Sequence, residues 1–417
     1  MRRPVPFGHE FRKAYYASLD ENINPVNHGS YGATPDPVYD AYFTHVKADA
    51  AYPDRYCRIQ LRDDYVAALK SLADLVHCDY RWLALVNNTT TGVNTVLRSL
   101  KFRAGDKVLI ASTSYGACAK TVAFLRNTVG VEPVVVELNY PISDDEVVAQ
   151  FAAAFTEHRP KLAMFDAVSS MPGVTVPFPR LVELCRQHSV LSLIDAAHSV
   201  GLLPLNLSET RPDFFVSSLH KWLGVPRGCG MLYIDRSHWH QVETLPISHS
   251  YVEPADATDD DDWLINHFFF TGTNNYAQIA SIPAAIAFRE QVGGEAAIHK
   301  YCGDLATEVG ERLAAKWGTQ YLHNDPKIAM VTVEIPLDRF DAPYQQFADN
   351  FDAWSNYSGE IMLDRRQFVP WIAHNGKLWA RFSCQVYTEA ADFYRASDVL
   401  VAALATTVAD AKKGLVH

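Results

Sequence analysis

The sequence lacks long hydrophobic runs and blocks of like charge. Its longest apolar runs, such as residues 107–111, are far shorter than the roughly 20 residues that cross a bilayer, which excludes a transmembrane protein. The 37 basic and 48 acidic side chains give a net charge of −11 without a Lys/Arg-rich block, which argues against binding to nucleic acid or an anionic membrane. No apolar segment follows the two arginines near the N-terminus, so we expect a cytoplasmic protein.

Cysteine is scarce, and its spacing suggests no cross-link. The chain has seven cysteines and no C-x-x-C, so neither a zinc knuckle nor a disulfide framework is predicted, and most should be reduced thiols in the core. The acidic segment 256–262 lacks the glycine and the terminal glutamate of a calcium-binding loop, so a solvated loop is the simpler interpretation. We therefore predict no metal site.

From about residue 80, short apolar runs alternate with amphipathic stretches. This alternation predicts strand–helix units on a mainly parallel sheet, an α/β fold whose large domain covers residues 31–292. Ser143 and Glu146 form the capping box of a helix that continues to about residue 155, and Pro179 suits the first turn of a helix that ends near residue 187. The seven expected strands are 82–87, 107–111, 132–138, 161–167, 190–195, 213–217 and 230–234.

The sequence pattern changes after about residue 293. A long helical stretch leads to strand-like segments at 328–335 and 378–384, and an alanine-rich helix follows. We expect a smaller α+β domain over residues 293–417.

Lys221 lies just after the expected strand 213–217, in the string Ser-Ser-Leu-His-Lys-Trp. Open α/β sheets bind ligands at the carboxyl ends of their strands, and a partly desolvated amine there can form a Schiff base with a carbonyl cofactor. Lys221 is therefore our candidate nucleophile. Taken alone, the string also fits a solvated surface lysine.

Asp195 ends the apolar strand 190–195. A buried carboxylate is costly unless a cation pairs with it, and the protonated nitrogen of a pyridoxal ring would be such a cation. The alternative is an aspartate that caps the next helix. His198, three residues later, would lie within reach of the phenolic oxygen of such a ring, or it is an ordinary loop histidine.

Thr90 and Thr91 open a helix after the first expected strand, in the string Asn-Asn-Thr-Thr-Thr-Gly-Val-Asn. Hydroxyl groups and free backbone N–H groups at a helix N-terminus suit a phosphate ester. No G-K-[ST] follows, so a Walker A site for a nucleoside triphosphate is not predicted. A plain threonine cap is the alternative.

These three motifs occur in an order that resembles pyridoxal-phosphate (PLP) enzymes of the class V aminotransferase family, which have the type I aminotransferase fold. The resemblance runs from about residue 6 to about residue 410. Within this family, the sequence is most similar to fungal ergothioneine-pathway hercynylcysteine sulfoxide lyases and to loline-pathway enzymes described as cysteine desulfurase-like. The further segments that carry it are 27–32, 113–121, 168–173 and 379–387.

The resemblance implies how the cofactor is held. Lys221 would bind PLP as an internal aldimine, Asp195 would pair with the pyridine nitrogen, and Tyr115 would pack over the ring. Thr273 would reach the phosphate from the partner subunit of a homodimer. The phosphate ligands of the same chain would be Thr90, Thr91, Ser217 and His220.

The resemblance also implies a substrate site, with an N-terminal arm (residues 1–30) contributing to it. Arg381 would bind the substrate α-carboxylate, and Asn27 and His28 would border the substrate. Arg58 would recognise a second charge or is a solvated surface residue. Cys118 matches a cysteine proposed to protonate the departing sulfur, with a buried small hydrophobe as the alternative.

Two features bear on the reaction. His198 stands where the fungal lyases have glutamine, and the segment 344–367 has no cysteine, which disfavours the persulfide relay of cysteine desulfurases. The resemblance therefore predicts a β-eliminating carbon–sulfur lyase of secondary metabolism that acts on a cysteine conjugate or a cysteine sulfoxide. The alternative is an enzyme that uses the same carbanion for condensation with an aldehyde or imine, or for epimerisation. A silent PLP-binding protein is less expected because Lys221 and Arg381 are both present.

Overall fold

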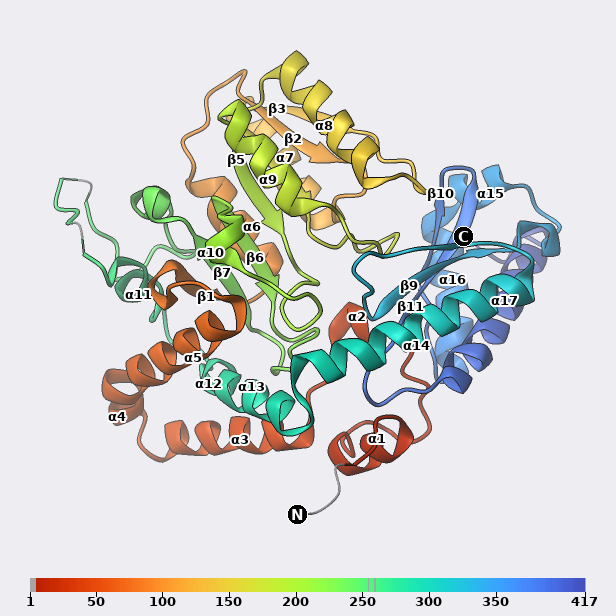
Figure 1. Cartoon of the computed structure of the whole chain (residues 1–417), viewed down its shortest axis with the longest axis horizontal. Coiled ribbons are helices and arrows are strands. Elements are labelled where there is room, and N and C mark those ends of the chain that lie inside the picture. Colours follow the sequence, from red (N-terminus) through yellow and green to blue (C-terminus); the bar gives the residue numbers. More distant parts are fainter. Residues whose placement is uncertain (1–4, 254, 259, 417) are drawn as a thin grey trace.

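A seven-stranded sheet forms the centre of the computed structural model, which describes residues 5–253, 255–258 and 260–416 (Figure 1). Its strand order is β1-β7-β6-β5-β4-β2-β3, and β7 alone runs antiparallel to its neighbours. Every predicted strand is present, with ends within two residues of those expected. The strands are β1 (Leu83–Val86), β2 (Lys107–Ala111), β3 (Glu132–Val136), β4 (Leu162–Asp166), β5 (Leu191–Asp195), β6 (Phe214–Ser218) and β7 (Gly230–Ile234).

Helices cover both faces of this sheet (Figure 1). One face carries α6 (Thr89–Ser99) and α7 (Gly116–Val129), and the other carries α8 (Asp144–His158) and α9 (Phe178–His188). The capping box of Ser143 begins α8, as the sequence predicts. The remaining helices of this part are α3 (Asp36–Ala51), α4 (Pro53–Arg55), a π-helical turn (Tyr56–Gln60), α5 (Leu61–Val76), α10 (Leu207–Thr210), α11 (Trp263–Phe268), α12 (Ala277–Ala280) and α13 (Ile282–Gln291), with 3-10 turns at Tyr80–Trp82 and Arg236–Gln241.

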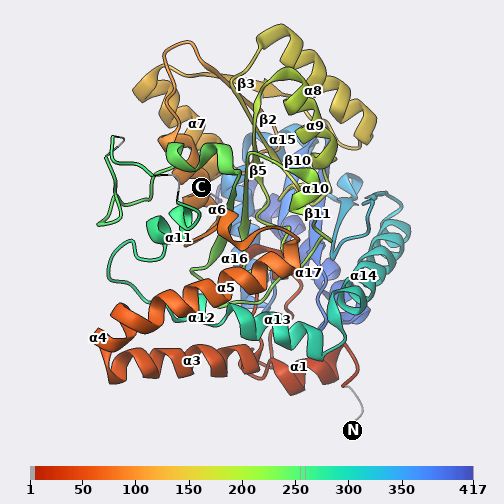
Figure 2. The same ribbon diagram turned by 60° about the vertical axis from the view of Figure 1, so that its left-hand side comes forward.

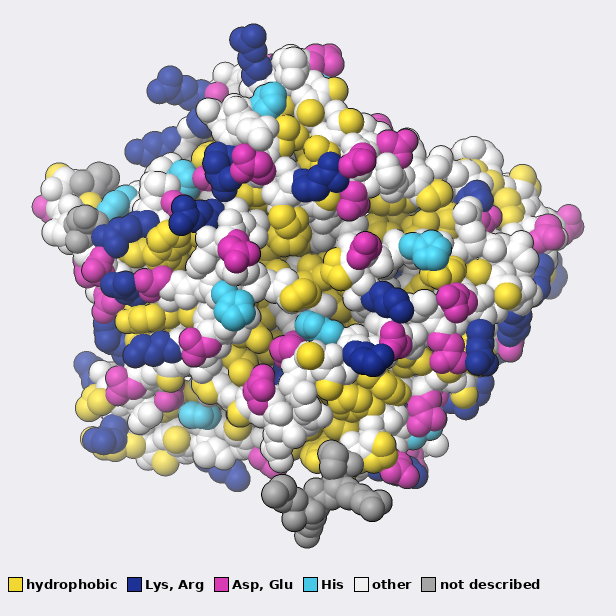
Figure 3. All heavy atoms as spheres, in the orientation of Figure 1, with side chains coloured by type: hydrophobic (Ala, Val, Ile, Leu, Met, Phe, Trp, Pro, Cys, Tyr) yellow, Lys and Arg dark blue, Asp and Glu magenta, His cyan; other side chains and the backbone are white. Residues whose placement is uncertain are grey.

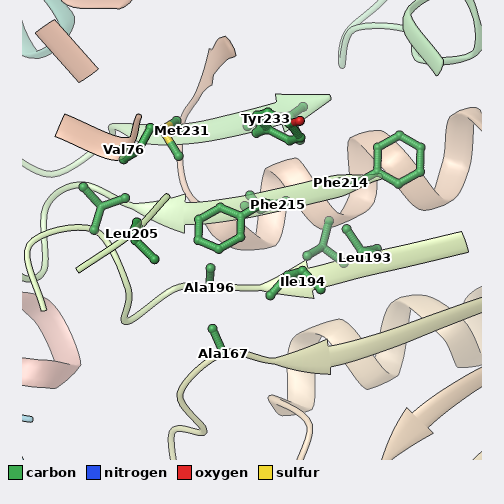
Figure 4. Close-up of a cluster of buried hydrophobic side chains, with 14 of the residues drawn as sticks. Val76, Ala167, Leu193, Ile194, Ala196, Leu205, Phe214, Phe215, Met231 and Tyr233 are labelled. Atoms are coloured by element: carbon green, nitrogen blue, oxygen red, sulfur yellow. The ribbon is translucent and has the colours of Figure 1, made fainter. Parts of the chain in front are cut away.

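The central strands are buried on both sides. Leu193 and Ile194 of β5 lie beside Phe214 and Phe215 of β6, and all four are fully buried (Figure 4). Helices on both faces leave no solvated side, which is why these strands occur in the sequence as continuous apolar runs. The rigid sheet fixes the positions of the residues that follow its strands.

A second sheet of four antiparallel strands has the order β10-β11-β9-β8. It forms a smaller core with α14 (Gly294–Trp317), α15 (Tyr344–Asp349), α16 (Phe351–Asp364) and α17 (Ala390–Ala411), and a 3-10 turn lies at Leu337–Arg339. The long helix α14 connects the two parts of the chain (Figures 1 and 2). The predicted domain boundary lies just before α14. The strands are β8 (Tyr321–Leu322), β9 (Met330–Ile335), β10 (Trp371–His374) and β11 (Lys377–Ser383).

The N-terminal segment joins both parts through α1 (His9–Tyr15) and α2 (His28–Tyr31). Asn27 forms a bridge with Ser383 of β11, and Gly32 lies against the backbone of His220. Gly32 has φ of +67°, and a Cβ atom there would lie 1.8 Å from the His220 carbonyl oxygen, so only glycine allows this approach. The arm is thereby wedged between β11 and the segment after β6.

Charges of both signs are interspersed over the face shown in Figure 3. Within the described ranges, no helix is both long enough and apolar enough to cross a membrane. The described ranges leave out residues 1–4, 254, 259 and 417. Part of the predicted arm and part of the acidic segment 256–262 are therefore outside them.

Candidate active site

Two buried carboxyl groups meet at the carboxyl ends of β4 and β5. Asp166 and Asp195 are direct neighbours in the parallel register. Burial raises the pKa of both groups, and the charge of Asp195 raises the pKa of Asp166 further. Asp195 accepts hydrogen bonds from Cys118 Sγ and from the backbone N–H of Ala197, each 3.1 Å long. Among the described residues it has no ion-pair partner, so its side chain is suited to bind an external cation.

Lys221 follows β6, the strand beside β5. Its Nζ lies 3.1 Å from His198 Nε2. Burial, aided by the charge of Arg381, lowers the pKa of Lys221 to about 8. The neutral, nucleophilic amine is therefore far more populated near neutral pH than in a solvated lysine, whose pKa is about 10.4. This environment favours the nucleophile interpretation over that of a surface lysine.

The N-terminus of α6 lies at the same edge of the sheet. The side chain of Asn88 accepts the backbone N–H of Thr91 at 2.9 Å, so Asn88 caps the helix and the threonine-cap alternative is wrong. Gly92 packs against β6, because a Cβ atom there would lie 2.3 Å from a methyl group of Val216. Thr90 and Thr91 thus lie in the first helical turn, where free N–H groups and the helix dipole attract an anion.

Ser217 and His220 line the neighbouring segment. Ser217 Oγ is buried and accepts the N–H of Val200 at 3.1 Å. Nδ1 of His220 lies 3.3 Å from the carbonyl oxygen of Cys229, so it donates and leaves Nε2 open. Thr273 is exposed in the loop after α11, where it and Thr91 line a hollow of about 250 Å³. The contact of Thr273 with the phosphate of a cofactor bound in the partner subunit stays a prediction.

Arg381 of β11 is a buried cation that has no anionic partner among the residues that the structure describes. Its exposed fraction is 2%. Nη1 donates to the Ser170 carbonyl at 2.8 Å, and Nη2 donates to Asn27 Oδ1 at 2.9 Å and to Ser30 Oγ at 2.8 Å. Nε is buried and has no hydrogen-bond partner within the described ranges, and burial lowers the pKa of Arg381 to about 10. A guanidinium held only by neutral groups is ready to bind a carboxylate.

His28 and Tyr115 lie differently with respect to Lys221. His28 is buried behind the lysine backbone, with Nε2 2.8 Å from the Lys221 carbonyl oxygen and Nδ1 2.7 Å from the hydroxyl of Tyr387. Burial lowers the pKa of His28 to about 4, so it is neutral. Tyr115 directly precedes α7 and is half exposed, and its packing over a cofactor ring stays a prediction.

Cys118 is buried, whereas Arg58 is exposed to solvent. Cys118 on α7 donates its S–H to Asp195 Oδ2, and burial followed by the charge of Asp195 raises the thiol pKa, so it stays protonated. Arg58 is exposed and pairs with Asp54 at 3.3 Å. It lies in the π-helical turn Tyr56–Gln60 that follows α4, and both views show α4 far from β11 (Figures 1 and 2). Within one chain, Arg58 does not join the site.

Sequence reasoning missed four contributing residues. Asp166 ends an apolar strand exactly as Asp195 does, and the same rule would have found it. Ser30 and Ser170 hold Arg381 from two distant segments, for which the sequence carries no local signal. Trp222 donates from Nε1 to His198 Nδ1 at 3.1 Å.

The comparisons with known proteins agree with this geometry. The family model described as "Aminotransferase class-V" matches residues 37–345. The hercynylcysteine sulfoxide lyase of Schizosaccharomyces pombe is 28% identical over 394 residues, which cover 94% of this chain and 97% of the relative. The L-cysteine desulfhydrase-like protein lolT1 of Epichloe uncinata is 31% identical over 436 residues and 95% of both chains.

The fold has a close counterpart among solved structures. The complex of the cystine C-S lyase C-DES with cysteine persulfide has a TM-score of 0.74 at 18% identity and covers 91% of this chain and 98% of that one. At this identity the match shows the fold alone, and it confirms the predicted architecture of a large, mainly parallel sheet with a smaller C-terminal part.

Proposed function

The chain belongs to the class V aminotransferase family, and we propose that it is a PLP-dependent carbon–sulfur lyase that removes a sulfur group from Cβ of an L-cysteine derivative. The residues present fit the cofactor. Asp195 has no cationic partner in the described part of the chain, Lys221 offers an amine with a lowered pKa, and the first turn of α6 suits a phosphate. The observation that carries the proposal is the proximity of this set to Arg381, whose guanidinium fork meets no anion among the described residues.

When bound, PLP supplies an electron sink for the negative charge that develops on Cα of an amino acid. Asp195 keeps the pyridine nitrogen protonated, and Arg381 orients the substrate through its carboxylate. Lys221 Nζ, whose pKa burial lowers to about 8, takes the proton from Cα in its neutral form. Loss of the sulfur group from Cβ, with uptake of water, gives pyruvate, ammonia and the sulfur product.

The names of the relatives support elimination. One relative is a sulfoxide lyase and the other is desulfhydrase-like, whereas condensation with an aldehyde or imine and epimerisation are not favoured. A cysteine conjugate or a cysteine sulfoxide of the hercynylcysteine type is therefore the substrate class we propose.

The role of Cys118 as an acid toward the departing sulfur stays a prediction. Its S–H is directed at Asp195 Oδ2, so the thiol has to break this hydrogen bond before it can protonate a sulfur atom. Its high pKa keeps the proton available for either role.

We also propose a homodimer in the cytoplasm. Apolar and aromatic side chains are exposed along α2, α3 and the π-helical turn, where a second copy would cover them. Arg58 and Thr273, both exposed, would then approach the partner's site. The exposed side chains are Tyr31, Phe43, Tyr52 and Ile59.

The test is the absorbance spectrum of the purified protein before and after addition of L-cysteine conjugates and sulfoxides, with pyruvate assayed in the same sample. We expect a visible cofactor band and pyruvate release. Lys221→Ala should lose the covalently held band on dialysis, whereas the surface control Lys300→Ala should keep it. An unchanged band in Lys221→Ala would refute the assignment, and a band without pyruvate from any of these substrates would refute elimination.

A further inference from the structure

His198 lies between two consecutive residues of the segment that follows β6. Trp222 Nε1 is 3.1 Å from His198 Nδ1, and Lys221 Nζ is 3.1 Å from His198 Nε2. His198 and Trp222 are each 2% exposed, so water does not compete for these contacts. The indole, the imidazole and the amine therefore form a continuous chain of hydrogen bonds.

The chemistry of the indole fixes the direction of this chain. An indole N–H can only donate, so Nδ1 of His198 must present its lone pair. Burial lowers the pKa of His198 well below its ordinary value, so the ring is neutral and carries a single N–H. That proton must be on Nε2, which faces Lys221. The Lys221 amine can accept it only in its neutral form.

Charged groups of both signs surround the pair, and burial together with Arg381 has the larger effect on Lys221. Arg381 faces both side chains and opposes a positive charge on either of them. The carboxyl groups near Lys221 favour its charge but do not outweigh burial and Arg381. The groups that face Lys221 are Arg381, Asp195, Cys118 and Asp166, and those that face His198 are Lys221, Arg381, His220 and His28.

We propose that Trp222 is a positioning residue, which holds His198 in the tautomer that donates from Nε2. In the free chain this N–H is directed at Lys221, and with the cofactor on Lys221 it donates to the phenolic oxygen of the ring. The inference rests on the proposed cofactor site and does not depend on the sulfur substrate. Without the indole N–H, the other tautomer becomes accessible and turns a lone pair toward that oxygen.

The experiment is a pH titration of the visible absorbance of the holoenzyme without substrate. Trp222→Phe keeps an aromatic ring beside His28, whose ring centroid lies 5.1 Å from that of Trp222, but it removes the N–H. A donor to the phenolic oxygen favours the deprotonated chromophore, so its loss should raise the midpoint by about one pH unit, or tenfold in proton affinity. In Trp239→Phe, an equally buried indole loses its bond to the Ile234 carbonyl (3.0 Å), and the midpoint should not move.

A double substitution separates positioning from packing. His198→Leu should raise the midpoint by itself, and adding Trp222→Phe should change it no further, because the indole acts only through His198. No shift in Trp222→Phe, or the same shift in both backgrounds, would overturn the proposal.

A second variant, His198→Gln, tests the proposal even if the Trp222→Phe protein does not fold. His198→Gln accepts from Trp222 through Oε1 and donates through Nε2, so its midpoint should stay near that of the wild type. A midpoint as high as in His198→Leu would overturn the inference. The lack of any visible band in the wild-type protein would instead refute the cofactor site itself.

Discussion

Arg381→Lys retains the positive charge at the carboxylate-binding position but removes the guanidinium fork. The three neutral acceptors around Arg381 hold two of its nitrogens at 2.8–2.9 Å, which leaves the fork in one fixed orientation. A lysine ammonium cannot present two parallel N–H groups to a carboxylate. One lost charge-assisted hydrogen bond costs about 1.5–3 kcal/mol, so kcat/KM should fall about 10- to 150-fold at neutral pH.

The same substitution should introduce a new pH dependence. Burial lowers the pKa of Arg381 from its ordinary 12.5 to about 10. An equal effect on lysine, whose ordinary pKa is about 10.4, gives a pKa of about 8. A cationic group with a lowered pKa is charged below that value and loses its charge as pH rises. The variant should therefore lose carboxylate binding further above about pH 8, where the wild-type arginine stays charged.

The assay is the initial rate of pyruvate release as a function of substrate concentration, between about pH 7 and about pH 9.5. Dividing the kcat/KM of the variant by that of the wild type cancels the pH dependence that both proteins share. This ratio should fall further above about pH 8. The control Arg312→Lys, an exposed arginine paired with Glu308, should give a ratio near one throughout. An unchanged KM in Arg381→Lys would place carboxylate recognition elsewhere, and a pH-independent ratio would refute the argument from burial.

Three further outcomes are expected. If Cys118 is the acid, Cys118→Ala should slow turnover of substrates with poor sulfur leaving groups more than of those with good ones; an equal loss for both would leave the thiol only its contact with Asp195. Exchange of the Cα proton should increase up to about pH 8 and then level off, because the base is Lys221 with a pKa lowered by burial to about 8; a rate that still rises near pH 10 would contradict this. Phe43→Asp should weaken the proposed dimer in light scattering, and an unchanged mass would remove α3 from the interface.

The sequence was informative where burial and chain direction alone decide the structure. Strands covered on both faces are continuous apolar runs, so all seven strands of the large sheet were predictable. Asp195 is an ionisable residue inside such a run, and that cost marked it as a functional candidate, whereas Arg381 became a candidate only through the family resemblance. The parallel direction of β5 and β6 then brings Asp195 and Lys221 to one edge of the sheet.

The sequence was uninformative where contacts join distant segments. The hydrogen bond from Cys118 to Asp195 and that from Trp222 to His198 depend on how α7 and the loops pack, which no local pattern encodes. The strands β8 and β10 have two and four residues, too few for a periodic signal. The position of Arg58 depends on a π-helical turn that no sequence pattern predicts.

As far as the described residues go, the site keeps an anion and a cation without ion-pair partners in one buried region. Asp195 is held by a thiol and a backbone N–H, and Arg381 is held by neutral oxygens, so neither group neutralises the other. Leaving each charge without a counterion costs stability, and the raised pKa of Asp195 and the lowered pKa of Arg381 reflect that cost. A pyridinium nitrogen and an α-carboxylate supply the two missing charges. The residues that destabilise the free chain are therefore those that select a PLP-bound amino acid, and the holoenzyme with substrate should be its most stable state.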